Sequence, residues 1–486
     1  MSLSHLPCRT FAPTLVFGCC LVIFFTESTA AATLAAFPGA EGAGALTVGG
    51  RSGAILRVTN LDDSGPGSLR AAVETEGRRT VVFAVGGTIV LQSSLRVTHP
   101  YLTVAGQTAP GDGIQIRTTS DQGILRIATH DVIWRYTRIR HGYTSKESNA
   151  DNVTIENGAF NVVLDHNSIM WSTDENIGIW SGGRTLPPPS RISIQWNLLA
   201  EPLKAHPTQV LTGASTAAAA DQMTDLDFHK NFMANSGWRN PLFKHKSGRF
   251  ISNLMYNAGR YYMQVAGGGQ IDAISNHYVQ KNPNPAQGIR EFDVVSVTQD
   301  PRYPTGAPRI HLAGNVGPNN PDGVLDNWTA MARRIAHENA ERKGEGETPL
   351  NVTHRRSAPL PAAGFAITTI PAVPAGGLAA ALLPTVGCSR RLDGEGQWVS
   401  VRDAADKRVI RELTGGTGFV PANENEVGGY PEVSGGPAYP DANANGMSDK
   451  WEARHRVVDP HADPDGDGYT NLEEFLNATL PNVRDI

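Results

Sequence analysis

Apolar and polar positions repeat in a short phrase between Ile133 and Val279, with an asparagine set among apolar residues. The phrase returns five times, at Asn167, Asn197, Asn231, Asn253 and Asn276. These asparagines lie 30, 34, 22 and 23 residues apart, so the shorter spacings fit one turn of a coil and the longer ones a turn with an inserted loop. A repeat of this length with several strands per turn is typical of a parallel β-solenoid.

The asparagines are expected to form a ladder along the coil. One turn cannot bury its own inward side chains, so the turns must stack, and an asparagine at the same bend of each turn can hydrogen-bond to the next. The alternative is that asparagine recurs at loop ends only because it tolerates a left-handed backbone. In both cases the pattern predicts an all-β solenoid.

Further strands are predicted upstream, where short apolar segments are bounded by Gly, Pro, Asp or Asn. These segments are 80–85, 88–91, 102–105, 114–117, 124–127 and 132–139. A short helix at Ser68–Val73 would cover the open end of the coil. Downstream, helices are predicted at Leu325–Arg342 and Val401–Leu413, and the Ala- and Pro-rich segment Arg355–Thr385 is expected to be an extended strap.

The first 32 residues read as a secretory signal. Arg9 supplies the positive charge, Phe11–Phe25 is the apolar stretch, and small residues follow at Ser28–Ala32. Lipid attachment at Cys19 is an alternative. Removal of this segment leaves Cys388 alone, so no intrachain disulfide is expected.

Length and charge complete the expected organisation. A solenoid grows by adding turns, so 486 residues do not require several cores. The net charge of -5 gives no general attraction to nucleic acid or anionic membranes. We therefore expect a secreted monomer without a membrane span. Its expected parts are a signal peptide (1–32), a β-helix (33–295), an extension with a glycine-rich linker (296–436) and a small helical calcium-loop module (437–486).

The calcium-loop module is predicted from two loops with oxygen-bearing side chains at positions 1, 3, 5, 9 and 12 and glycine at position 6. These side chains are Asp441, Asn443, Asn445, Asp449 and Glu452 in the first loop and Asp463, Asp465, Asp467, Asn471 and Glu474 in the second. This is the spacing of EF-hand calcium loops. The alternative is a pair of solvated acidic loops. The loops also resemble dockerin-like tails, which usually end in Asp rather than Glu, so attachment to a scaffold or cell surface stays open.

Four phrases elsewhere carry a second resemblance: Asn60–Arg70, Val163–Asn167, Trp171–Asn176 and Arg239–Lys244. From about Phe37 to about Gly418 the chain resembles polysaccharide lyase family 1, the pectate lyases. The resemblance implies a right-handed parallel β-helix that cleaves polygalacturonate, an acidic plant cell-wall polysaccharide, by calcium-assisted β-elimination. The reaction removes a proton next to a carboxylate, which becomes feasible once Ca²⁺ and cationic side chains neutralise that carboxylate.

The resemblance also implies the residues of the site. It assigns calcium binding to Asp151, Asp174 and Glu175, proton abstraction to Arg239, and substrate binding to Lys204 and Lys244. The chain departs from the family at two places, where Asn149 stands, and where Gly178 and Ile179 stand, in place of acids.

Two other functions stay open. A polygalacturonase-like glycoside hydrolase would need a pair of catalytic carboxylates at one cleft, and that family's paired-aspartate phrases are not found. A non-catalytic β-helix that binds carbohydrate is the second alternative, because a fold alone does not decide function.

Overall fold

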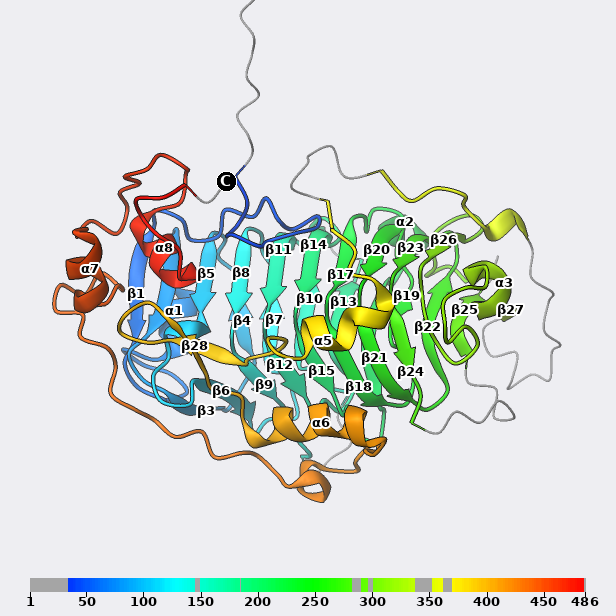
Figure 1. Ribbon diagram of the computed structural model, residues 1–486, viewed down its shortest axis with the longest axis horizontal. Helices are drawn as coiled ribbons and strands as arrows, with labels where there is room; N and C mark the ends of the chain where they lie inside the picture. The colour runs from blue at the N-terminus through cyan, green and yellow to red at the C-terminus, as the bar shows by residue number, and fades with distance from the viewer. Residues whose placement is uncertain are drawn as a thin grey trace, which may run out of the picture. The chain divides into compact units, whose positions relative to one another are not determined.

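The computed structural model describes residues 34–144, 149–183, 185–281, 290–295, 300–336, 352–361 and 369–484. The segment read as a secretory signal lies outside the described residues. Residues 34–486 form one compact unit, in which three parallel sheets run along a single coil (Figure 1). The coil is a right-handed parallel β-helix, as expected, because twisted strands favour right-handed crossovers.

A complete turn of the coil contributes one strand to each sheet, and turns near the ends contribute fewer. Within the described residues sheet A has ten strands, sheet B eight and sheet C nine. Sheet A contains β1 (Ala54–Val58), β2 (Arg79–Phe83), β5 (Leu102–Ala105), β8 (Val132–Arg135), β11 (Phe160–Asp165), β14 (Ser190–Gln195), β17 (Leu226–His229), β20 (Ser247–Ile251), β23 (Gln270–Ile274) and β26 (Arg309–Ala313).

Sheet B contains β3 (Gly87–Leu91), β6 (Ile114–Thr118), β9 (Arg138–Arg140), β12 (Ser168–Met170), β15 (Leu198–Ala200), β18 (Phe232–Ser236), β21 (Leu254–Ala258) and β24 (His277–Val279). Sheet C contains β4 (Leu95–Val97), β7 (Leu125–Ile127), β10 (Val153–Glu156), β13 (Glu175–Ser181), β16 (Thr208–Ala214), β19 (Leu242–Phe243), β22 (Tyr261–Ala266), β25 (Arg290–Val295) and β27 (Ala332–Ala336). The strands β28 (Arg390–Leu392) and β29 (Trp398–Ser400) form a separate antiparallel pair.

Helices are short and lie outside the coil. They are α1 (Leu69–Glu74), α2 (Ala217–Ala220), α3 (Asn327–Met331), α5 (Leu378–Leu382), α6 (Ala404–Gly415), α7 (Asp449–His455) and α8 (Asn471–Asn477), with 3-10 turns η1 (Gly106–Thr108), η3 (Val352–His354), η5 (Ala375–Gly377) and η6 (Glu424–Val427). In the part of the chain that the structure describes, no helix has both the length and the apolar character needed to cross a bilayer.

The core is a column of apolar side chains inside the coil. On sheet A, Val132, Val162 and Ile192 are paired in successive turns and are completely buried. Alternation along a strand sends the intervening residues outward. The helix α1 is confirmed at the expected place, since Ser68 caps it and Leu69 joins the same core.

The predicted asparagine ladder is confirmed at the bend between sheets A and B. The Oδ1 atom of Asn231 accepts bonds from the backbone N–H and the side-chain amide of Asn197, and Asn253 does the same for Asn231. The left-handed backbone belongs to the residue before each asparagine, such as Lys230 with φ 55°. The asparagines are therefore selected for stacking rather than for a left-handed conformation.

Sheets A and B are covered by other parts of the chain. The helices α5 and α6 pack on the outside of sheet B, where Leu378 and Val409 join a buried cluster with Leu198 and Phe232. The segment after Leu34 and the C-terminal helices lie on sheet A.

One predicted helix is wrong over most of its length. The segment Leu325–Arg342 was expected to be helical, but the described part contains only the short helix α3 and then the strand β27, which pairs with β25. The ladder also continues beyond Val279, where the expected pattern fades, through Asn315 and Asn327.

Candidate active site

Two of the carboxylates assigned to calcium lie at the start of neighbouring strands of sheet C. Asp151 stands two residues before β10, and Glu175 is the first residue of β13. Val153 pairs with Ile177, so the two acids occupy the same place in successive turns. Neighbouring strands are about 4.8 Å apart, and the Glu175 N–H donates to Asp151 Oδ1 at 3.2 Å. Acids that are 24 residues apart in sequence therefore meet.

Arg239 reaches the same cluster from further along the coil. Its guanidinium forms an ion pair with Glu175, and Thr208 Oγ1 donates to the same carboxylate at 3.1 Å. The backbone of Arg239 is left-handed, with φ 57°, and its carbonyl accepts a bond from Val210. This left-handed bend in the backbone at Arg239 directs its side chain toward Glu175.

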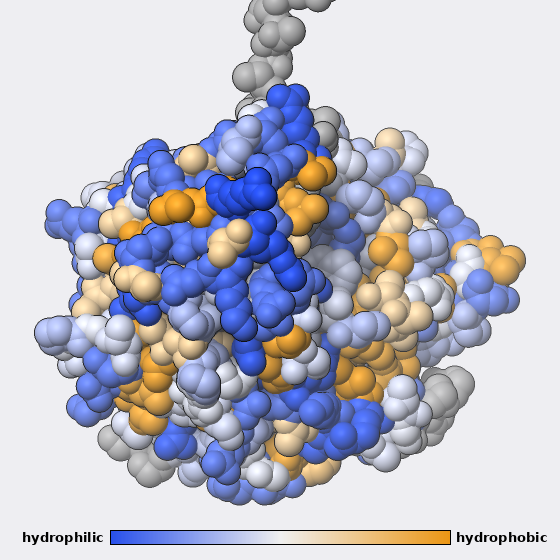
Figure 2. Space-filling model, turned by 60° about the vertical axis from the view of Figure 1, so that its left-hand side comes forward, coloured by the Kyte–Doolittle hydropathy of each residue, from blue (hydrophilic) through white to orange (hydrophobic). Residues whose placement is uncertain are grey.

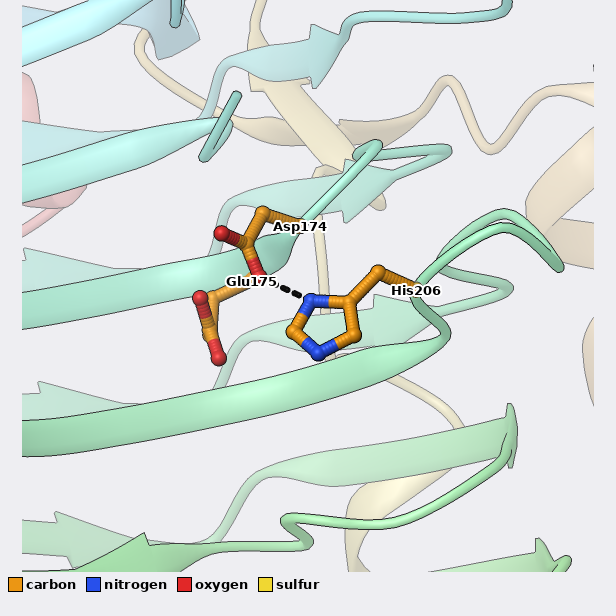
Figure 3. A group of neighbouring side chains, drawn as sticks. All are labelled: Asp174, Glu175 and His206. Carbon is orange, nitrogen blue, oxygen red and sulfur yellow. Dashed lines mark hydrogen bonds and ion pairs between the residues drawn. The ribbon is translucent and has the colours of Figure 1, made fainter. Parts of the chain in front are cut away.

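His206 is a member of the cluster that the sequence did not reveal. Its Nδ1 atom is hydrogen-bonded to Asp174, as Figure 3 shows. Ligand atoms of Asp174, Glu175 and His206 all lie within 4.8 Å of one another. His206 and Asp174 are 32 residues apart. Only the register of the strands brings them together, and no local motif marks the histidine.

The carboxylates of Asp151, Asp174 and Glu175 shift one another's pKa values. Burial and the charges of Glu175 and Asp174 raise the pKa of Asp151 well above its ordinary value. Burial raises the pKa of Glu175 to about 7, although the Arg239 guanidinium acts in the opposite direction. Burial also disfavours the charged form of Asp174, but hydrogen bonds from His206 and Glu175 and the nearby positive charges lower its pKa overall. The cluster thus contains more carboxylate than the Arg239 guanidinium can neutralise.

This donor set fits a divalent cation. Carboxylate oxygens are the ligands that Ca²⁺ prefers, and a bound cation would favour the ionised form of all three acids. His206 holds Asp174 in place through the hydrogen bond of its Nδ1 atom.

Gly178 explains one departure from the family pattern. A Cβ atom at this position would lie 2.1 Å from Asp151 Oδ2, because the Asp151 carboxylate extends over the glycine backbone. Thr154 Oγ1 holds the same oxygen at 3.2 Å. An acid at position 178 would have to displace Asp151, so the two arrangements exclude each other. Asn149, the other departure, is exposed.

The two predicted substrate lysines lie on the chain segments that carry His206 and Arg239. Lys204 is exposed between β15 and β16, two residues before His206, and its backbone N–H donates to Pro421 at 2.8 Å. Lys244 follows β19 on the same segment as Arg239, and its Nζ is 4.8 Å from the ring centre of Tyr303. The structure thus joins Asp151, Asp174, Glu175 and Arg239 by contacts, and places the lysines nearby along the chain.

The two C-terminal loops have matching backbone geometry. Asp441 and Asp463 each accept a bond from the glycine N–H at position 6, at 3.1 and 2.9 Å. These glycines, Gly446 and Gly468, have φ of 83° and 102°, which a side chain rarely adopts. The sharp turn predicted at position 6 is confirmed in both loops.

Three of the predicted ligand side chains lie close together in the second loop. Carboxylate oxygens of Asp463, Asp465 and Asp467 lie within 4.8 Å of one another. Asn471 at position 9 is almost fully buried, and its Oδ1 accepts no hydrogen bond from the described residues. In the first loop the amides of Asn443 and Asn445 donate to Glu452 at 3.0 and 2.8 Å. The remaining predicted ligands, Asp449 and Glu474, lie in α7 and α8.

The loops and their helices pack against the first turns of the β-helix. Met447, Trp451, Leu472 and Phe475 form one buried cluster with Val82 and Ala105 of sheet A. On this side of the molecule the surface intersperses polar and apolar residues (Figure 2). The apolar side chains of this buried cluster are turned toward the coil, whereas Val458, Leu480 and Val483 of the module are exposed.

Comparison with known proteins gives the family of this chain. No protein-family model matches the chain. It is 31% identical over 457 residues to "Probable pectate lyase C" of Aspergillus terreus, covering 92% of this chain and 95% of that protein. The protein of the same name from Emericella nidulans is 29% identical over 456 residues, with 92% and 93% covered. The chain belongs to the pectate lyase family and is a polysaccharide lyase.

Solved structures give weaker alignments. The major allergen from cedar pollen aligns at 16% identity with a TM-score of 0.47, over 72% of this chain and 92% of its own. A thermostable pectate lyase aligns at 13% identity with a TM-score of 0.47, over 72% and 97%.

Proposed function

We propose that this protein cleaves (1,4)-linked polygalacturonate by calcium-assisted β-elimination. The observation that carries the proposal is the contact between Arg239 and Glu175 within a cluster that also contains Asp151 and Asp174. It places a cation beside three carboxylates on the outside of one sheet, where a long polymer can lie along the coil.

Calcium would be held by Asp151, Asp174 and Glu175, and when bound it would neutralise the uronate carboxylate and so acidify the neighbouring C5 proton. Arg239 is proposed to act as the base in its neutral form, so it first releases a proton to solvent and returns to the guanidinium when it takes up the C5 proton. The C5–H and C4–O4 bonds break, a C4=C5 double bond forms, and the leaving oxygen receives a proton from solvent. The charge that develops is spread over cationic groups that need no rearrangement during the reaction.

Lys204 and Lys244 would bind carboxylates of neighbouring sugar units. Lys204 is exposed and so can reach a ligand without first breaking a buried contact. The thiol of Cys388 is buried against the carbonyl of Tyr136, so we give it no part in the chemistry.

The two C-terminal loops are proposed to bind Ca²⁺ independently of the reaction. The matched bonds from Gly446 and Gly468 and the buried, unsatisfied Oδ1 of Asn471 support this proposal. We further propose that the protein is secreted after removal of residues 1–32, acts as a monomer, and uses the module for stability or for attachment to a surface.

The decisive experiment is ultraviolet absorbance of the unsaturated product, with polygalacturonate as substrate and with or without a calcium chelator. We expect product formation that stops on chelation and returns with added Ca²⁺. New reducing ends without ultraviolet absorbance would instead indicate a hydrolase. Binding without any product would indicate a carbohydrate-binding protein.

A further inference from the structure

Trp180 lies on the outer face of sheet C, on the strand that begins with Glu175. It is the sixth residue of β13 and is half-buried, whereas Ile177 and Ile179 on the same strand are completely buried in the core. Its side chain therefore faces away from the coil, as alternation along the strand requires. Burial in the core does not account for a tryptophan at this position.

Gly213 makes room for the indole ring. Trp180 pairs in register with Gly213 of β16. A Cβ atom at position 213 would lie 2.9 Å from Cζ3 of Trp180 and 3.2 Å from Cβ of Lys244, so a side chain there would displace one of them. The six-membered ring of Trp180 thus leans across the backbone of the next turn, beside the aliphatic stem of Lys244.

The neighbouring charges suit an acidic sugar. Lys244 lies on one side of the ring. On the other side Trp180 pairs in register with Glu156, which is bound by Arg96 at 3.3 Å and by Arg126 at 2.8 Å. Two guanidinium groups on one carboxylate leave a net positive charge. The ring is therefore flanked by positive charge along the axis of the coil.

We propose that Trp180 stacks on the ring of one uronate unit next to the bond that is cleaved, and so determines substrate affinity. An indole offers a rigid apolar face to the C–H face of a sugar, while Lys244 meets the carboxylate of the same unit. Gly178, over which the Asp151 carboxylate lies, is two residues earlier on the same face, about 7 Å away by the rise of a strand. This inference rests on the proposed function, because the stacked sugar is taken to be part of its polymer.

Steady-state kinetics on polygalacturonate test the inference. We expect Trp180→Ala to raise KM about tenfold with little change in kcat, and Trp180→Phe to restore most of the affinity. Gly213→Val should raise KM similarly, because its side chain displaces the indole ring or the Lys244 stem beside it. Trp398→Ala is the matched control, since Trp398 is also half-buried but lies against Arg390, outside sheet C. An unchanged KM in both Trp180→Ala and Gly213→Val would overturn the inference.

A binding measurement separates this inference from the proposed reaction. Retardation in gels that contain polygalacturonate can compare Arg239→Ala with the double variant Arg239→Ala/Trp180→Ala, neither of which needs to turn over. We expect the double variant to migrate faster. If the wild-type protein formed no unsaturated product, the proposed function would fail, yet a difference in retardation would still support stacking. Equal retardation would refute stacking whatever the turnover.

Discussion

Arg239 is proposed to combine two roles that a substitution can separate. A guanidinium is essentially always protonated in proteins, so its protonated form supplies positive charge beside Glu175, whereas action as a base requires prior loss of a proton. We expect Arg239→Ala to lower kcat by about 10³-fold or more, because both the proton acceptor and the charge are lost. Arg239→Lys should keep the charge and recover part of the rate only if charge is the larger contribution.

The measurement is the initial rate at which the ultraviolet absorbance of the product increases, together with the melting temperature of each variant. Near-native turnover by Arg239→Ala, in a protein that melts normally, would show that the site has been assigned to the wrong residue.

The buried side chain of His245, which lies outside the carboxylate cluster, makes the stability of the folded protein depend on pH. Burial lowers its pKa from 6.5 to about 3, so between these values the unfolded chain binds a proton that the folded chain does not. Stability is therefore full above pH 6.5 and is lost as the pH falls toward 3. At pH 5 the contribution lost is about 2 kcal/mol relative to pH 7.5. Urea unfolding at the two pH values should show a smaller difference in His245→Gln than in the wild type, and an equal difference would contradict the prediction.

At the site, the sequence could indicate residue types but not all of the partners. Asp174 and Arg239 stand in phrases typical of a family, and the same resemblance assigns Asp151 just before a strand, so all three could be named in advance. His206 could not, because the bond to Asp174 depends on which strand follows which in the stack. The sequence does not distinguish Trp180 from the other tryptophans, because only the register of the strands brings Gly213 beneath its ring.

The asparagine ladder is the element that could be predicted best from the sequence. We expect its interruption to lower the free energy of unfolding substantially. Asn231 donates to the carbonyl of Ile194 and to Asn253, and it accepts two bonds from Asn197. Asn231→Ala would leave buried polar groups unsatisfied on both neighbours. We expect a loss of about 2–5 kcal/mol in the free energy of unfolding.

Denaturant unfolding measures this loss, and Asn257→Ala provides the comparison. Asn257 is half-buried, and its amide donates to Asn235. We expect a loss below about 1.5 kcal/mol there, typical of one hydrogen bond. Equal losses at the two positions would show that the ladder adds no stability of its own.

The wrong helix at Leu325–Arg342 shows where local preference fails. The segment Ala332–Ala336 includes good helix formers, so local preference predicts that the helix α3 continues through it. In the folded chain these residues form the strand β27, which pairs with β25. This pairing satisfies backbone N–H and C=O groups at the edge of β25, which a helix at this position would leave unpaired. Spacing could not reveal this, since the interval from Asn276 to Asn315 is 39 residues.

At the scale of the whole molecule, the C-terminal module ties the last residues of the chain to the first turns of the coil. Arg51 bonds Glu473 at 2.7 Å, and Arg135 bonds Asn477 at 2.7 Å. Gln107 donates to the carbonyl of Leu476 at 3.2 Å. All three contacts are made by residues of α8. The same helix contains Asn471 and Glu474, which are predicted ligands of the second loop.

Calcium that orders the second loop should therefore stabilise the β-helix as well as the module. A ligand at about a hundredfold excess over its Kd adds about 3 kcal/mol to a folded state that alone binds it. We expect the melting temperature of the full chain to rise with Ca²⁺ and the rise to shrink strongly in Asp463→Asn. Asp151→Asn should keep most of the rise, because Asp151 belongs to the other site. If Asp463→Asn melted with the same calcium dependence as the wild type while Asp151→Asn lost it, the stabilising ion would be at sheet C, and the contacts of α8 would hold the coil without help from metal.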